Sequence, residues 1–327
     1  MLLKCGPNYY DITMLLWNAL QLASFVSSAK VLFEYQGHEL PNIGPKGIFD
    51  YPVHPNLPTD GEQLTIKDDR LVINSYPFKH TRADFHDALK FQMYTNDRFK
   101  CNSGKVTVQM TGGALMHGVE DNPFGEEPML SQIDARLVAS VFNVQDDKGQ
   151  VFNFIITNAR ISAVIQAPFI FPPSQEEVTS TMSYNIPLVE TQAGEEHTLA
   201  LIFDAASQSV SWSVDGTIHY TWTVDSQIPQ ENCILRWGDL NRFTYPGNFA
   251  VGFGNYETLS YYPPLNDAKA FGIEYKGLVN LPFELPLFDP QSGEPAEYMT
   301  SSSEQKDHTW DRGAILRIRD IIVTYEV

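Results

Sequence analysis

The side chains best suited to binding a small molecule are concentrated between residues 236 and 262. Two guanidinium groups, Arg236 and Arg242, stand there among many aromatic rings. Phe249 and Phe253 alternate along a predicted strand, so we expect them in the core. The other rings are predicted to line a pocket for a sugar ring or an apolar, aromatic molecule, with an arginine binding an anionic or enol oxygen. They are Trp237, Phe243, Tyr245, Tyr256, Tyr261 and Tyr262.

Histidines offer acid–base chemistry at two other places. His80, Asp84 and His86 lie in the stretch HTRADFHDALK, where a carboxylate holding an imidazole would raise its basicity or help it bind a metal. No third distant ligand joins them, so we favour a solvated loop and predict no metal site. His117 lies in a predicted turn between Gly113 and Gly118. We count it with Arg236 and Arg242 as a candidate catalytic residue at a cleft mouth, the alternative being a surface histidine.

Several common kinds of catalytic site are missing from the sequence. It has no glycine-rich phosphate loop, no dinucleotide fingerprint and no G-x-S-x-G elbow. Cys5, Cys101 and Cys233 are widely spaced and match no zinc pattern or disulfide framework. We therefore predict a site that uses neither a cofactor nor a metal.

The chain is acidic, with a formal net charge of −18 and an isoelectric point near 4.7. Its 22 Lys and Arg residues are spread along the sequence, whereas nucleic-acid binding needs clustered cations. Nucleic acid is therefore not an expected partner. With 43% hydrophobic residues, the chain has enough apolar material for a large core.

Residues 1–29 are predicted to form a unit of their own. The apolar stretch from Ile12 to Ala29 fits either a packed helix or a signal segment that is retained, and we favour the helix because the preceding residues make a poor signal. Asn18 and Gln21 interrupt it, and it is too short to span a bilayer. An intracellular location is slightly favoured, and the secretory pathway follows if the segment is a signal. Residues 30–327 are predicted to form one structural unit.

The remaining elements are predicted to be strands. Leu199–Phe203, Val210–Val214 and Ile218–Trp222 form an antiparallel meander, with turns at Asp204–Ser209 and at Asp215-Gly216. About a dozen such runs predict an all-β sandwich or barrel with long Pro/Gly-rich loops. Residues 111–133 are read as one long loop, and Ala314–Val327 as a pair of strands.

Three segments resemble the concanavalin A-like lectin and glucanase jelly roll. They are the Ser103–Val108 strand after a glycine turn, the run from His197 to the turn Val214-Asp215-Gly216, and the final strand from Ile318 to Tyr325. The resemblance implies an antiparallel two-sheet β-sandwich. Glucanases of that kind also carry acidic residues at alternate positions of one strand, and no E-x-D-x-E pattern occurs here. The nearest acids, Glu120-Asp121 and Glu126-Glu127, lie in the predicted loop.

In size, acidic balance and all-β pattern, the sequence is also similar to fungal hetero-Diels–Alderases that join a tropolone-derived quinone methide to a terpene. That resemblance implies a cofactor-free enzyme of natural product biosynthesis, which holds an apolar or aromatic substrate in a reactive conformation. Proximity alone contributes roughly 7–11 kcal/mol to such reactions. We rank this pericyclic cyclisation first, with a glycan-binding module or a glycoside hydrolase as the alternative. A homodimer is left open.

Overall fold

The computed structural model describes eleven parts of the chain. These are residues 29–51, 63–78, 89–120, 128–135, 137–166, 181–237, 243–256, 274–275, 287–288, 295–296 and 312–327. The predicted N-terminal helix and the His80–Asp84–His86 stretch lie outside them. Among the described residues, no helix has the length and apolar character needed to cross a membrane.

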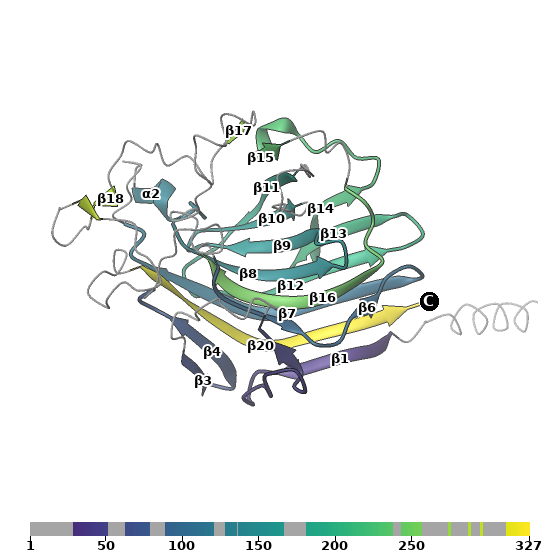
Figure 1. Cartoon of the computed structure of the whole chain (residues 1–327), viewed down its shortest axis with the longest axis horizontal. Helices are drawn as coiled ribbons and strands as arrows, with labels where there is room; N and C mark the ends of the chain where they lie inside the picture. The colour runs from purple at the N-terminus through teal and green to yellow at the C-terminus, as the bar shows by residue number, and fades with distance from the viewer. Residues whose placement is uncertain are drawn as a thin grey trace, which may run out of the picture.

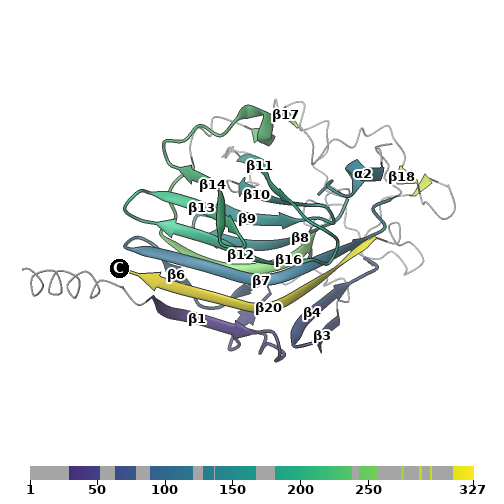
Figure 2. The ribbon, with the colours of Figure 1, turned by 180° about the vertical axis from the view of Figure 1, so that it is seen from behind.

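The described strands form two large antiparallel sheets and one small one (Figures 1 and 2). The eight-stranded sheet has the order β14 (Thr217–Thr223), β13 (Ser209–Val214), β12 (Glu196–Asp204), β7 (Lys105–His117), β20 (Gly313–Glu326), β4 (Arg70–Ser75) and β3 (Gln63–Lys67), with β1 (Lys30–Gln36) also paired to β20. The ten-stranded sheet has the order β17 (Glu274–Tyr275), β15 (Cys233–Trp237), β11 (Thr181–Glu190), β10 (Arg160–Gln166), β9 (Val151–Ile156), β8 (Ala139–Asp146), β16 (Asn248–Tyr256), β5 (Leu89–Thr95) and β2 (Phe49–Asp50), with β6 (Phe99–Lys100) paired to β16. The small sheet pairs β18 (Leu287–Phe288) with β19 (Pro295–Ala296), and the helical turns are α2 (Pro128–Ser131) and η3 (Gln230–Asn232).

The predicted all-β, antiparallel two-sheet sandwich is confirmed, and its arrangement is consistent with a jelly roll. The predicted meander forms β12, β13 and β14, and the turn between β13 and β14 places Asp215 and Gly216 at φ angles of 51° and 80°. Such positive angles suit Gly and Asp, which is why this dipeptide makes a tight hairpin turn.

Two predictions about strand limits were wrong. The region after Met110 does not become a loop at once, because β7 continues to His117 and pairs with β20 up to Gly313. Gly112 and Gly113 serve this pairing, since a Cβ atom would lie 2.3 Å from the Arg317 carbonyl oxygen at the first and 2.3 Å from the Glu195 carbonyl oxygen at the second. The residues that looked like loop formers are therefore required by close backbone packing.

The C-terminal segment is one long strand and not a strand pair. β20 runs beside β7 along almost its whole length (Figure 2), with a register irregularity between Ile318 and Asp320. Near this irregularity, Asp320 accepts a hydrogen bond of 2.9 Å from the Thr111 hydroxyl of β7. A bulge lets the strand carry this polar residue without ending.

Aromatic side chains fill the space between the two large sheets. Phe203 of β12 stacks on Phe249 of β16 with ring centroids 4.8 Å apart, and Phe152 of β9 packs against Phe203 at 5.9 Å. The buried Trp212 of β13 donates its indole N–H to the backbone oxygen of Asn153 in the opposite sheet, at 2.8 Å. That bond fixes where β9 lies relative to the eight-stranded sheet.

Candidate functional site

One short sequence pattern recurs in three strands of the ten-stranded sheet. An asparagine stands between two apolar or aromatic residues in Phe142-Asn143-Val144 of β8, Phe152-Asn153-Phe154 of β9 and Tyr184-Asn185-Ile186 of β11. The flanking residues belong to the hydrophobic core. Because successive strand residues point to opposite faces, the three asparagines project from the outer face of the sheet.

The strand register places these asparagines in one row. Asn143 pairs with Asn153, Asn153 with Val164, and Val164 with Asn185. On the other side of Asn143 the row continues through Gly252 of β16 to Tyr94 of β5. Neighbouring strands lie about 4.8 Å apart, so the row crosses the sheet at regular steps.

A small network of amides and phenols occupies the β5 end of this row. The hydroxyl of Tyr94 accepts hydrogen bonds from Gln92 Nε2 at 2.5 Å and from Asn143 Nδ2 at 2.7 Å. The Tyr94 ring reaches Asn143 because Gly252 lies beneath it, where a Cβ atom would be 2.5 Å from Tyr94 Cδ1. We call these side chains, with the three asparagines and Tyr256, the amide–phenol face.

Both phenols of this face remain neutral over the physiological pH range. Burial raises the pKa of Tyr94 above its ordinary value, and the hydrogen bonds from Asn143 and Gln92 offset only part of that rise. Burial, followed by the nearby Tyr94, raises the pKa of Tyr256 further. Each phenol therefore keeps its proton and can donate a hydrogen bond.

Three carbonyl oxygens of the amide–phenol face lack a partner. Asn143 Oδ1, Asn153 Oδ1 and Asn185 Oδ1 are buried and accept no hydrogen bond. A buried acceptor without a donor costs roughly 1–3 kcal/mol. Three such acceptors in one row mark this face as unusual, because most buried polar atoms of folded proteins have a hydrogen-bond partner.

The residues predicted from the sequence do not gather at one site. Phe243 is buried against Trp222 and Tyr184, with ring centroids 6.2 and 6.1 Å away, and the Tyr245 hydroxyl donates to the Cys101 carbonyl oxygen at 3.0 Å. Both precede β16, whereas Tyr256 ends it, about 27 Å further along the strand. Of the aromatic set, only Tyr256 is seen to belong to the amide–phenol face.

The other candidates lie elsewhere or outside the described residues. His117 ends β7 and stacks on Tyr76 with ring centroids 4.2 Å apart. Arg236 and Trp237 end β15, paired through their backbones with Met182 and Thr181 of β11. Arg242, Tyr261 and Tyr262 lie outside the described residues. Within the described ranges, no three His, Cys, Asp or Glu residues gather closely enough to hold a metal ion.

A second polar cluster joins a hydroxyl, an imidazole and a carboxylate. Thr191 Oγ1 lies 2.8 Å from His197 Nε2, and His197 Nδ1 lies 2.7 Å from Asp215 Oδ2. The order of groups is that of a nucleophile, a base and an orienting acid. Nucleophilic acyl transfer also needs free N–H groups for the oxyanion.

Most backbone N–H groups around Thr191 are already bonded. The N–H of Thr191 is bonded to the Ala159 carbonyl oxygen, that of Gln192 to the Glu195 carboxylate and that of Gly194 to the Ala114 carbonyl oxygen. The cluster instead ties the turn before β12 to the turn between β13 and β14. We interpret it as a structural link.

Asp215→Asn should test this link through its pH dependence. Burial alone would raise the pKa of Asp215, but hydrogen bonds with His197 and from the Thr198 N–H outweigh it and leave the pKa below its ordinary value. A lowered folded-state pKa stabilises the fold above the unfolded pKa of about 3.9 and loses this effect as pH falls through the folded value. The carboxylate is 56% exposed, so we expect the variant to lose at most about 1 kcal/mol at pH 7.

Urea unfolding of wild type and variant between pH 3 and pH 7 measures this difference. Asp225→Asn is the matched control, because Asp225 is exposed and has no side-chain partner among the described residues. A stability difference that persists unchanged at pH 3 would contradict the proposed link.

Comparison with known proteins gives a family but no activity. No curated protein matches the chain. The catalytic domain of the endo-1,3-beta-glucanase (laminarinase) of Thermotoga petrophila has a TM-score of 0.43 and 11% identity, covering 92% of this chain and 99% of its own. The family GH16 endo-beta-1,3(4)-glucanase SCLam has a TM-score of 0.43 and 10% sequence identity, and the match covers 92% of both chains. Alginate lyase A1-II' of polysaccharide lyase family 7 has a TM-score of 0.39 and 7% sequence identity, and the match covers 81% of this chain and 83% of its own.

These structural likenesses are too distant to carry an argument about activity. The family comparison is different, since one family model matches residues 57–327, which is most of the chain. Its description is a family of unknown function. The protein therefore belongs to the family of unknown function DUF6081.

Proposed function

We propose that this protein binds a hydroxyl-rich ligand, a glycan, on the amide–phenol face of its ten-stranded sheet. The observation that carries the proposal is the row of unpaired acceptors Asn143 Oδ1, Asn153 Oδ1 and Asn185 Oδ1. Acceptors call for donors, and sugar hydroxyls supply donors at close intervals. An apolar ligand would leave all three oxygens unpaired.

The other groups of this face suit the same ligand. Tyr94 and Tyr256 stay protonated, so each offers a hydroxyl donor beside an aromatic ring. The face is uncharged along the row, since its members are asparagine, valine, glycine and tyrosine. Neutral amides and phenols provide hydrogen bonds in both directions without the desolvation cost of a charge.

Binding is better supported than hydrolysis. Glycoside hydrolysis normally uses two carboxyl groups about 5–5.5 or 6.5–9.5 Å apart. Along β8 and β9 the outward positions near the row are held by Val141, Asn143, Gln145, Val151, Asn153 and Ile155, and none is acidic. Of the acids considered from the sequence, Glu120 is exposed after β7, and Asp121, Glu126 and Glu127 lie outside the described residues.

The predicted cyclisation is retained as a second candidate because of one observation. The Tyr94 hydroxyl accepts two amide N–H bonds, which polarise it and leave its own proton to donate. Such a donor would stabilise negative charge developing on the oxygen of a quinone methide. This hetero-Diels–Alder role remains a prediction.

Asn153→Leu separates the glycan proposal from a purely structural role. We expect loss of one hydrogen bond to lower glycan affinity by roughly two- to twelvefold, since such a bond contributes about 0.5–1.5 kcal/mol. The same change removes a buried unpaired oxygen, so the free energy of unfolding should stay equal or rise by about 1 kcal/mol. A structural asparagine would instead lose stability when replaced.

A glycan array would first identify a bound sugar, and calorimetric titration with that sugar would then compare the variants. Gln109→Leu is the matched control, because it removes a partly buried amide from the outer face of the other sheet. The proposal fails if wild type selects no glycan, or if Asn153→Leu binds as tightly as wild type. In the first case, conversion of a quinone methide by wild type but not by Tyr94→Phe would support the cyclisation.

A further inference from the structure

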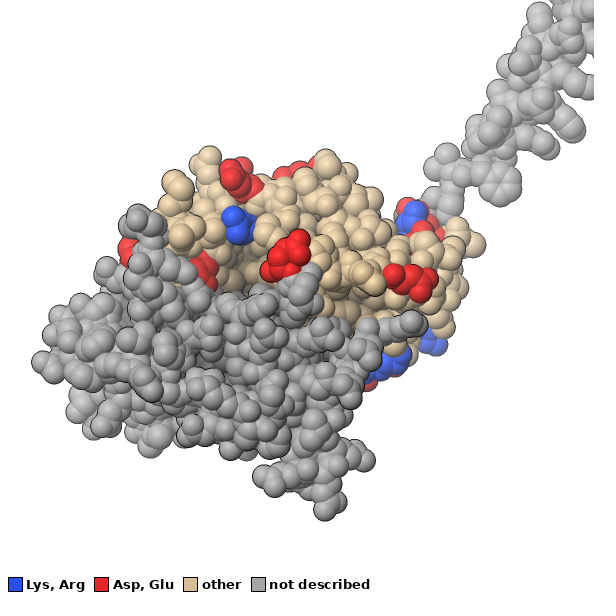
Figure 3. Space-filling view, turned by 90° about the horizontal axis from the view of Figure 1, so that it is seen from above, with Lys and Arg blue, Asp and Glu red and all other residues tan. Residues whose placement is uncertain are grey.

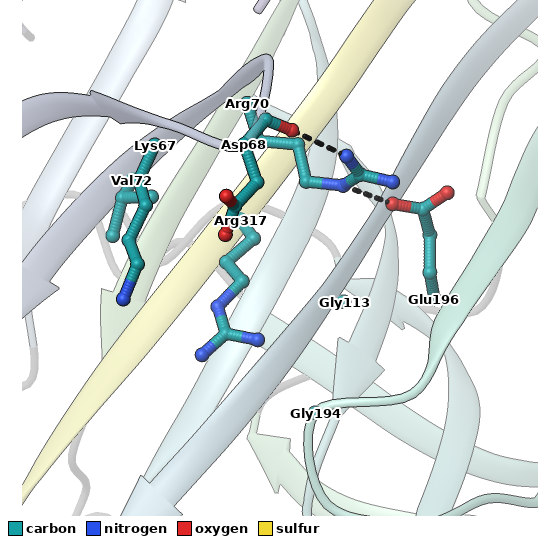
Figure 4. A pocket seen from close by; sticks show the side chains of 8 residues that line it. All are labelled: Lys67, Asp68, Arg70, Val72, Gly113, Gly194, Glu196 and Arg317. Carbon is teal, nitrogen blue, oxygen red and sulfur yellow. Dashed lines mark hydrogen bonds and ion pairs between the residues drawn. The ribbon is translucent and has the colours of Figure 1, made fainter.

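We infer that the outer face of the eight-stranded sheet holds a second binding site, which takes an oxoanion group. A pocket of 310 Å³ opens there. Its strands belong to the eight-stranded sheet, whereas the amide–phenol face lies on the ten-stranded sheet. The pocket is lined by Lys67, Asp68, Arg70, Val72, Gly113, Gly194, Glu196 and Arg317 (Figure 4). Its volume suits a small ligand.

Two glycines line the pocket. Glu196 of β12, Gly113 of β7, Arg317 of β20 and Val72 of β4 are neighbours in one row across four strands. Gly113 carries no side chain, which lets the Gly194–Glu195 backbone pack closely over it between Glu196 and Arg317. A Cβ atom at Gly194 would lie 4.0 Å from Arg317 Nη1, so the absence of a side chain there also leaves room around the guanidinium.

The charges around the pocket are unevenly paired. Glu196 is fully engaged, because its Oε2 accepts from Arg70 Nε at 2.6 Å and its Oε1 from Arg319 Nη1 at 2.9 Å. Arg70 also donates from Nη1 to the Asp68 carbonyl oxygen at 2.5 Å. These bonds leave Arg70 and Glu196 little capacity for a ligand.

Arg317 and Lys67 are the cations that remain available. Neither has a hydrogen-bond or ion-pair partner in the described part of the chain, and the Arg317 guanidinium is partly buried while Lys67 is exposed. Figure 4 shows the Arg317 guanidinium pointing toward Gly113 and Gly194, with the Lys67 amine on the other side of the pocket. A partly buried guanidinium without a partner favours a bidentate oxoanion.

The acidic character of the protein bears on how an anion would reach this pocket. The protein carries a net charge of −18, and the described residues visible in Figure 3 include isolated Lys and Arg side chains and no basic patch. Nonspecific attraction of anions is therefore weak, and binding must arise from local geometry. Two carboxylates line the pocket, and of these Glu196 is already paired with Arg70 and Arg319. Asp68 has no side-chain bond in the described structure and therefore opposes an anion most directly.

The ligand class is a small molecule with a carboxylate, sulfate or phosphate group. Titration calorimetry with succinate, inorganic sulfate and inorganic phosphate, each at low and high NaCl, would identify which group is preferred. We expect one of the three to bind, with affinity that falls as salt screens the charges. Arg317→Gln should weaken it by about tenfold or more, because a charge-assisted hydrogen bond contributes about 1.5–3 kcal/mol.

Three further variants make the result specific to this pocket. Arg317→Lys keeps the charge without the planar fork and should bind with intermediate affinity. Asp68→Asn removes the opposing charge and should bind more tightly. Lys105→Gln is the control, because Lys105 projects from the same face of β7 about 27 Å from Gly113 and should leave binding unchanged. Absence of binding by all three anions, or equal weakening by Lys105→Gln, would overturn the inference.

Discussion

Replacement of Trp212 by alanine should reduce the free energy of unfolding by about 3–5 kcal/mol, the range seen for large buried aromatic side chains. Trp212 is fully buried, and its ring lies 5.6 Å from that of Tyr220 and 6.3 Å from that of Phe152. Its indole N–H also satisfies the Asn153 carbonyl oxygen. The variant therefore loses apolar contacts and one hydrogen bond between the two sheets.

Two further variants divide this effect into its parts. Trp212→Phe keeps an aromatic ring but removes the N–H donor, so we expect a smaller loss. Ile218→Ala is the control on the neighbouring strand, because Ile218 is 55% exposed and should change stability by no more than about 0.5 kcal/mol. Urea unfolding would compare the midpoints. Equal midpoints for Trp212→Ala and Ile218→Ala would show that Trp212 does not join the sheets.

This bond also links the core to the candidate site. Trp212 bonds to the backbone oxygen of Asn153 from the core side of β9. The Asn153 side chain lies on the opposite side of the strand, in the amide–phenol face. A shift of β9 would therefore move Asn153 relative to Asn143. We expect Trp212→Phe to weaken ligand binding on this face even where the fold remains stable.

Most of the sandwich was predictable because local patterns determine it. Alternating apolar residues bury one face of each strand, and Asp68-Asp69 and Asp215-Gly216 adopt the positive φ angles of tight turns. The strand limit after Met110 was wrong because glycine occurs both in loops and where two backbones pack closely. Gly112 and Gly113 resemble loop residues, but here they allow the close approach of neighbouring backbones.

The candidate site was not predictable in the same way. Tyr94, Gly252 and Asn143 come from β5, β16 and β8, and they meet only because β16 inserts between two strands that precede it in the chain. Sequence periodicity does not show strand order. The repeated asparagine between core residues in β8, β9 and β11 was the available signal, since a polar residue flanked by buried ones marks the outer face of a strand.

The aromatic residues near Arg242 were predicted to line a pocket, but the two that the structure describes there, Phe243 and Tyr245, pack on the core. Phe243 proved to pack on Trp222 in the core, so its position outside a predicted strand did not imply exposure. Tyr245 similarly packs on the core and bonds to the Cys101 backbone. Loop residues beside a sandwich often close the end of its core, and composition does not distinguish that role from ligand binding.

Gly252→Ala should disrupt the amide–phenol face directly. The new methyl group would lie 2.5 Å from Tyr94 Cδ1 and 2.5 Å from the Met93 carbonyl oxygen, so the Tyr94 ring and the β5 backbone must both move. We expect a loss of about 1–3 kcal/mol in the free energy of unfolding, as for other overpacked sites. Because Tyr94 would no longer reach Asn143, binding of a glycan on this face should weaken as well.

Gly247→Ala is the matched control, because Gly247 directly precedes β16 and a Cβ atom there has no neighbour within 4 Å. That variant should bind normally and be as stable as wild type, or more stable by up to about 1 kcal/mol. In Gly252→Ala/Tyr94→Ala the ring is absent, so the double variant should be less destabilised than the sum of the single variants. Strict additivity would mean that the Tyr94 ring does not depend on Gly252, and the geometry proposed for this face would then be wrong.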